Sequence, residues 1–79
     1  MNKKEFIRLS ERMVKEYYNR YVAIYDDKKI NMSDIFMLGF CKTESGMRVL
    51  IRTKTHDTCT YEVTYDKATD EVHSFIFEK

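Results

Sequence analysis

The second half of the chain, from residue 35 to residue 78, is a series of apolar and β-branched segments separated by short polar turns. In the clearest segment, residues 58–66, apolar and polar side chains alternate strictly, which is typical of a strand with one buried face. Similar segments occupy about 35–43, 47–54 and 71–78. Turns this short join only neighbouring strands. The sequence therefore predicts four strands in an antiparallel meander.

The first third of the chain has the periodicity of a helix instead. Asn2 and Glu5 have the spacing of a capping box, which marks a helix start. Apolar residues then recur at spacings of three and four, at Phe6, Leu9, Met13, Tyr17, Tyr21 and Ile24. We expect a helix over about 3–25, with Asn19 on its solvent-exposed face. The predicted fold is α+β, one N-terminal α-helix packed on a four-stranded antiparallel β-meander, in a single domain over residues 1–79.

The lengths of the turns decide which strand side chains lie under the helix. Three-residue loops at the first two hairpins, with Gly46 in the left-handed conformation, pair odd-numbered residues with odd-numbered ones. The inner face then holds Ile35, Met37, Cys41, Met47, Val49, Ile51, Cys59, Tyr61, Val63 and Tyr65. The fourth strand has two possible registers. A four-residue loop turns Val72, Ser74 and Ile76 inward, and a five-residue loop turns His73, Phe75 and Phe77 inward; the first keeps the histidine out of the core and is preferred.

The other face of the predicted sheet is too apolar for a surface that only meets water. Candidate binding residues on this face are Phe36, Phe40, Arg48, Leu50, Arg52 and Lys54, with Leu38 beside them. Arginines among aromatic groups anchor protein interfaces, and they also hold phosphates and stack on bases. The simplest alternative is a solvated face on which the arginines pair across to Glu62.

No combination of residues predicts catalysis. Cys41 and Cys59 fall two strands apart, too far for a disulfide, and are interpreted as buried, inert thiols. His56, Asp57 and Cys59 are close in sequence, but no ligand pair has the spacing of a structural zinc site. The two glycines, Gly39 and Gly46, do not form a phosphate-binding loop. We expect no enzyme, no catalytic residue, no metal and no cofactor.

The charge of the chain is nearly balanced, with 14 basic and 13 acidic residues, which disfavours a non-specific nucleic-acid binder. No secretory signal pattern or membrane-spanning run is present in the sequence, so a cytoplasmic protein that does not enter membranes is expected. Tyr17, Tyr21, Tyr61 and Tyr65 are assigned to the core, and Tyr18 and Tyr25 to the helix flank. The apolar outer face of the sheet and the tyrosines on the helix flank are more apolar surface than one small core can cover. This surplus predicts a homodimer or a protein target.

Three segments, residues 33–36, 40–43 and 61–65, resemble a family of small uncharacterised proteins from phages and prophages of Gram-positive bacteria. The resemblance implies a bacterial host cell and an accessory protein that acts by stoichiometric binding. The leading hypothesis is a non-enzymatic protein that binds and blocks a host protein, as an anti-defence inhibitor does. The alternatives are a sponge for a phosphate-bearing signalling nucleotide, held at the basic sheet face or a dimer seam, and a weak single-stranded nucleic-acid binder.

Overall fold

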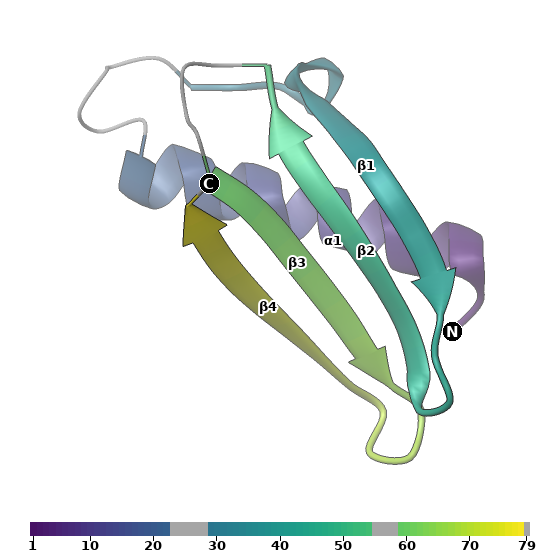
Figure 1. Ribbon diagram of the computed structural model, residues 1–79. Helices are drawn as coiled ribbons and strands as arrows, with labels where there is room; N and C mark the ends of the chain where they lie inside the picture. The colour runs from purple at the N-terminus through teal and green to yellow at the C-terminus, as the bar shows by residue number, and fades with distance from the viewer. Residues whose placement is uncertain (23–28, 55–58, 79) are drawn as a thin grey trace.

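One helix and four antiparallel strands form two layers (Figure 1). The computed structural model describes residues 1–22, 29–54 and 59–78. The strands are β1 (Ile35–Lys42), β2 (Gly46–Thr53), β3 (Cys59–Asp66) and β4 (Glu71–Glu78), in the sheet order β1-β2-β3-β4. This confirms the predicted α+β fold and its meander. The loop expected at 26–29 and the turn expected at 55–57 lie largely outside the described residues.

The helical segment begins where the capping pattern predicts. Helix α1 spans Lys3–Tyr17 and continues as a π-helical turn, η1 (Tyr18–Val22). At its start, the side chain of Asn2 accepts a hydrogen bond from the Glu5 backbone N–H at 2.8 Å and donates to the Glu5 carboxylate at 2.9 Å. Residues 23–25, the expected end of the helix, are not described. Within the described ranges, no helix has the length and hydropathy needed to cross a bilayer.

The buried side of this helical segment is rotated from the predicted one. Phe6, Ser10, Val14 and Tyr18 recur every fourth residue and are buried against the sheet. Tyr18 is only 2% exposed, whereas Tyr21 is 51% exposed and Tyr17 is also exposed. The assignment of Tyr17 and Tyr21 to the core, and of Tyr18 to the flank, was therefore wrong. The reason is Ser10, a polar residue in the buried row whose hydroxyl donates to the Phe6 carbonyl at 2.7 Å.

The core lies between α1 and the inner face of the sheet. Its strand residues come mostly from β2 and β3: Met47, Val49, Ile51, Tyr61, Val63 and Tyr65, joined by Ile35 and Ile30. The helix runs behind the sheet, across the strands, with its main contacts to β2 and then to β1 and β3 (Figure 1). The single helix thus covers one face of the sheet and leaves β4 the least covered strand.

The first hairpin is tighter than predicted. Thr43 and Gly46 pair through both backbone groups, at 2.9 and 3.3 Å, so the turn consists of residues 44 and 45 alone. Gly46 does not have a positive φ, so the expected left-handed conformation was wrong. A glycine is needed here for another reason: a Cβ would collide with the carbonyl oxygen of Tyr65 on the adjacent strand.

A bulge in β1 compensates for this two-residue turn. Near the turn, Phe40 pairs with Val49 and Cys41 pairs with Arg48, whereas past Leu38 the register shifts so that Met37 pairs with Ile51. A turn of two residues instead of three exchanges the inward and outward side chains of β1 relative to the prediction. The extra residue of a bulge restores the predicted order beyond it. Ile35 consequently lies inward as predicted. The predictions that Phe40 lies outward and Cys41 inward were both wrong, and Cys41 is exposed.

The register of the fourth strand follows the preferred alternative. Four residues, 67–70, separate β3 from β4, and the pairs Tyr65 with Val72 and Tyr61 with Ile76 place those β4 side chains on the inner face. Asp70 takes a positive φ of 55° at the end of the loop. The odd-numbered residues of β4, including His73 and Phe75, therefore belong to the opposite face.

Asn19 was expected to face water, but it anchors the segment that returns to the sheet. Its side chain accepts from the Ile30 N–H at 2.8 Å and donates to the Ile30 carbonyl at 3.2 Å. Asn19→Ala would leave both backbone groups without these partners, beside a buried isoleucine. We expect the free energy of unfolding, from urea denaturation followed by circular dichroism, to fall by about 1–3 kcal/mol. The neighbouring exposed Arg20→Ala should change it by less than about 0.5 kcal/mol; equal losses would contradict the assignment.

Tyr65 and Asp70 close the β3–β4 hairpin through their side chains. The tyrosine hydroxyl donates to the Asp70 carboxylate at 2.7 Å, and this bond, with burial and the negative charges of Asp70 and Asp66, raises the pKa of Tyr65 above 10.0. The neutral tyrosine therefore stabilises the fold fully below pH 10.0, and this contribution is lost as the pH rises through the elevated pKa.

Asp70→Asn removes the charge and weakens this bond while tolerating the positive φ. We expect the Tyr65 pKa, from an NMR titration of its ring carbon, to fall towards 10.0. Asp66→Asn should lower it less, because Asp66 is the weakest of the four causes. A Tyr65 pKa that is the same in Asp70→Asn and the parent protein would show that the hydrogen bond does not control the hydroxyl.

Candidate functional site

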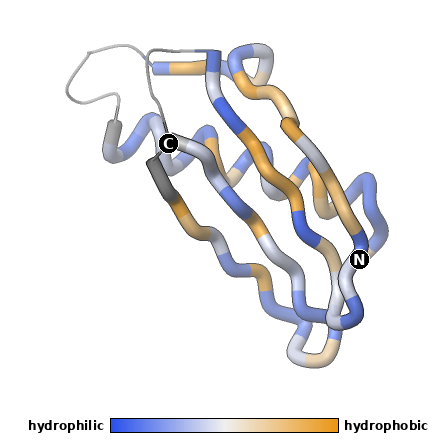
Figure 2. The backbone as a smooth tube through the Cα atoms, in the orientation of Figure 1, coloured by the Kyte–Doolittle hydropathy of each residue, from blue (hydrophilic) through white to orange (hydrophobic). Residues whose placement is uncertain are grey.

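No described helix or strand covers the face of the sheet opposite α1, which is the near face in Figures 1 and 2. We call it the outer face and define it by the described residues that the strand registers place there: Phe36, Cys41, Arg48, Leu50, Arg52, Thr60, Glu62, Thr64, His73 and Phe75. Four of the six predicted binding residues, Phe36, Arg48, Leu50 and Arg52, are brought together on it. The outer face is the candidate functional site.

The apolar members of the outer face come from three strands. Phe36 in β1 is 37% exposed, Phe75 in β4 is 58% exposed, and Leu50 in β2 is half-buried between them. Leu50 pairs across to Glu62, which in turn pairs with Phe75. Because no described helix or strand covers this side of the sheet, the exposed parts of these groups meet water. Clustered exposed apolar groups of this size mark interaction surfaces.

Two arginines lie on β2 on either side of Leu50. Arg48 is exposed, and Arg52 is half-buried next to Phe36 in the adjacent strand. The Nε of Arg52 is out of contact with solvent and has no hydrogen-bond partner. Such a group costs free energy unless a partner satisfies it. The outer face thus contains a guanidinium whose hydrogen-bonding capacity is not used within the chain.

These cations have no acidic partner in the described part of the chain. The one contact of this kind found there joins the Nε2 of His73 to a carboxylate oxygen of Glu71 at 3.1 Å, along β4. Glu62 is diagonal to both Arg48 and Arg52 in the register but forms no ion pair with either. The alternative in which the arginines pair across to Glu62 is therefore not what the structure shows. Their charge is available to a partner.

Two predicted site residues lie elsewhere. Phe40 points inward, with its ring centroid 6.4 Å from that of Phe6 and the Lys3 ammonium 4.7 Å above it. The bulge at Leu38 accounts for this reversal. Lys54 follows the end of β2 and is exposed, and its backbone N–H donates to the Asp34 carbonyl at 2.7 Å. It lies at the end of the sheet, beyond the paired part of the outer face.

A shallow depression of about 350 Å³ adjoins Arg48 near the hairpin turns. Arg48, Thr64 and His73 line it together with two acidic residues, Glu62 and Asp66. Hydroxyl, imidazole and guanidinium groups suit an anion, whereas the two carboxylates oppose one. The mixture favours a polar protein surface with both signs of charge over a multiply charged phosphate.

The outer face does not bring a nucleophile and a base together. Cys41 and His73 share one row of the sheet, but Arg48 and Thr64 separate them. Three strand spacings amount to roughly 14 Å, far beyond hydrogen-bond reach. Among the described residues, no three His, Cys, Asp or Glu side chains are grouped as a metal site would need. His56 and Asp57, considered above for zinc, lie outside the described residues, and the side chain of Cys59 is not described.

Phe75, His73 and Cys41 were not among the predicted binding residues, although the preferred register of the fourth strand already added Phe75 to the outer apolar patch. The first two are assigned to the outer face by the four-residue loop at 67–70, and the preferred register already implied them. Cys41 is there because of the bulge, for which the only local signal is Gly39, since a glycine within a strand often accompanies such an irregularity.

Comparison with known proteins agrees with an uncharacterised domain. No curated protein and no solved structure matches the chain significantly. One family model matches residues 7–79, which includes most of α1 and all four strands. Its description is a family of unknown function, DUF6275. The chain therefore belongs to the DUF6275 family.

Proposed function

We propose that this chain is a non-enzymatic binding protein that occupies the surface of another protein with its outer face. The observation that carries the proposal is the coexistence of Phe36, Leu50 and Phe75 with two arginines that no carboxylate within the described chain neutralises. Aromatic groups and arginines are the commonest binding hot spots. A partner surface that fits must offer apolar groups beside carboxylates.

The position of Arg52 makes the proposal more specific. Arg52 is half-buried beside Phe36, so its guanidinium is already partly desolvated, and a carboxylate that binds its exposed part displaces less water than one that binds Arg48. Arg48 is exposed and must lose its water on binding, so it contributes more to steering than to affinity. Arg52 is therefore the expected anchor, and Arg48 the residue that sets the salt dependence of association.

The resemblance to phage and prophage proteins supports a setting for this binding. In that setting the chain is an accessory protein in the cytoplasm of a bacterial host, and its target is a host defence protein that it blocks stoichiometrically. The gene neighbourhood tests the setting, since genes for phage structural or lysis proteins on both sides would support it.

A second candidate function is a sponge for a phosphate-bearing signalling nucleotide. The half-buried guanidinium of Arg52 and the depression beside Arg48 favour it, because guanidinium groups bind phosphate through two hydrogen bonds. The carboxylates of Glu62 and Asp66 in the same depression weigh against it. Weak single-stranded nucleic-acid binding has less support still, with a net charge of only +1.

The double substitution Arg48→Ala, Arg52→Ala tests the proposal. We expect it to abolish co-purification of the protein's partner from the producing cell, or to weaken the affinity for the purified partner at least about tenfold. The matched control is Arg8→Ala, Arg12→Ala, which removes the same charge from exposed positions on α1, in the opposite layer. The control should retain the partner.

A third variant separates apolar contact from charge. Phe75→Ala should leave the free energy of unfolding within about 0.5 kcal/mol, because the ring is mostly exposed, and should still weaken binding. Retention of the partner by the double arginine variant would refute the site. A thermal shift with cyclic dinucleotides that disappears in the double arginine variant would favour the sponge over protein binding.

A further inference from the structure

The two edges of the sheet differ in how they are protected. β1 and β4 are the edge strands. The β1 ladder is broken by the bulge at Leu38, and the strand ends in Lys42, both of which discourage pairing with another chain. β4 runs for eight residues with an unbroken register against β3, and it contains no lysine, proline or bulge. No described strand pairs with its other edge, so the outward-facing backbone N–H and C=O groups there can serve as a template for another strand.

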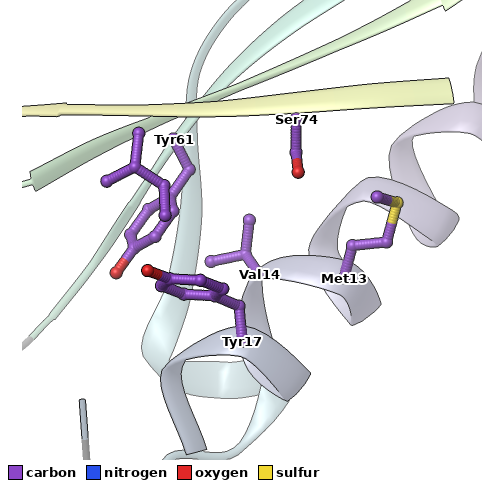
Figure 3. Close-up of a pocket in the computed structure, with 6 residues that line it drawn as sticks. Met13, Val14, Tyr17, Tyr61 and Ser74 are labelled. Atoms are coloured by element: carbon purple, nitrogen blue, oxygen red, sulfur yellow. The ribbon is translucent and has the colours of Figure 1, made fainter. Parts of the chain in front are cut away.

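Apolar surface is left open on the inner side of this same edge. α1 covers β4 less than the other strands, so Ser74 is exposed and Ile76 is 39% exposed. Between them and the helix is a notch of about 50 Å³, lined also by Met13, Tyr17 and Tyr61 (Figure 3). In that view Ser74 points from its strand towards the helix, and Tyr17 and Tyr61 lie together on one side of the notch.

The aromatic groups beside the notch continue out to the surface. The Tyr17 ring packs edge-on against Tyr61 at 6.1 Å between centroids, and the Tyr21 ring is tilted against it at 4.9 Å. Tyr21 is exposed and lines a second hollow with Met13 and Tyr17. An unpaired strand edge therefore lies beside a row of aromatic rings that starts in the core and ends in solvent.

From this arrangement we infer that β4 pairs antiparallel with β4 of a second copy, giving a two-fold symmetric dimer with one eight-stranded sheet. The inference does not depend on the proposed function, because the backbone edge of β4 and the notch on the inner face carry it; on the outer face, a register centred on Ser74 only places Phe75 of each copy opposite His73 of the other. The partner copy also closes the notch, which is incomplete in a single chain.

Symmetry restricts the geometry of this dimer. Two antiparallel copies of one strand are related by a two-fold axis perpendicular to the sheet, so each residue faces one of the same parity. Inner-facing residues then meet inner-facing ones. With the axis near Ser74, in the middle of the strand, Val72 of each copy lies opposite Ile76 of the other, a favourable apolar pair. The acidic residues of β4, Glu71 and Glu78, stay at the ends of the seam.

The same symmetry places both helices on one side of the extended sheet and both outer faces on the other. The exposed ring of Tyr21 and the notch of each copy face the seam, where the other copy shields them. The two outer faces become neighbours on a continuous surface, so the dimer presents two copies of Arg48 and Arg52 in the same direction.

The available area is consistent with a weak dimer. An eight-residue strand is roughly 27 Å long, and the shorter dimensions of the molecule are 22 and 19 Å. This side of the molecule therefore offers roughly 500–600 Å² per copy, at the low end of specific interfaces. Because a contact of this size is weak, we expect the fraction of dimer to rise with protein concentration.

Sedimentation across a wide concentration range tests the inference. The mass of the parent protein should rise from 9.6 kDa towards twice that value. Ser74→Lys places a charge at the seam and should remain at 9.6 kDa throughout. The matched control is Met37→Lys, at an exposed inner-face position on the other edge strand, which should dimerise like the parent.

Amide hydrogen exchange in the unmodified protein tests the same contact without relying on the folding of a variant. Alternate amides of β4 should exchange more slowly at high concentration, and those of β1 should not change. A parent protein that stays monomeric at every concentration would overturn the inference. So would a dimer that Ser74→Lys leaves intact, or one that Met37→Lys disrupts instead. Arg48→Ala, Arg52→Ala should leave the dimer unchanged, which separates this contact from the proposed binding site.

Discussion

One helix packs on one face of a four-stranded sheet, and this packing determines where the remaining apolar surface of the chain lies. Phe6, Val14 and Tyr18 bury the inner side chains of β2 and β3, and the chain has no second layer in its described part for the opposite face. A chain of 79 residues buries a modest fraction of its surface, so some apolar groups must remain outside the core. In this fold they gather in two places, the outer face and the β4 edge. Both proposed contacts follow from that distribution.

Much of the fold could be predicted from the sequence because its signals are local. The alternation in β3 and the capping residues Asn2 and Glu5 each determine the structure of their own segment. The register of β4 was also predictable, because the residues at 67–70 left two loop lengths and only one kept His73 out of the core. The prediction that the odd-numbered residues of β2 and β3 face the helix was also confirmed, because the register between these two strands contains no irregularity.

The incorrect predictions concern places where a single residue changes which side chains of an element are buried. The two-residue turn at 44–45 and the bulge at Leu38 each shift the register by one, and together they reverse only the stretch that contains Phe40 and Cys41. The turn length cannot be recognised from the sequence, because glycine at position 46 is compatible with both lengths, and Gly39 is only a weak local signal for the bulge. The helix was misread by one position because Ser10 is polar but buried, and Tyr18 rather than Tyr17 continues its row. Four candidate residues were nevertheless placed correctly because they precede or lie opposite the affected stretch.

Photo-cross-linking in the cell that produces the chain tests whether the outer face is a binding surface for another protein. A photoreactive phenylalanine analogue replaces Phe36, which is on the outer face and distant from the β4 edge, and in a second variant it replaces Arg12 on α1. The account predicts a covalent adduct with a different protein from position 36 and none from position 12. Adducts from position 12 alone, or from neither position, would contradict it.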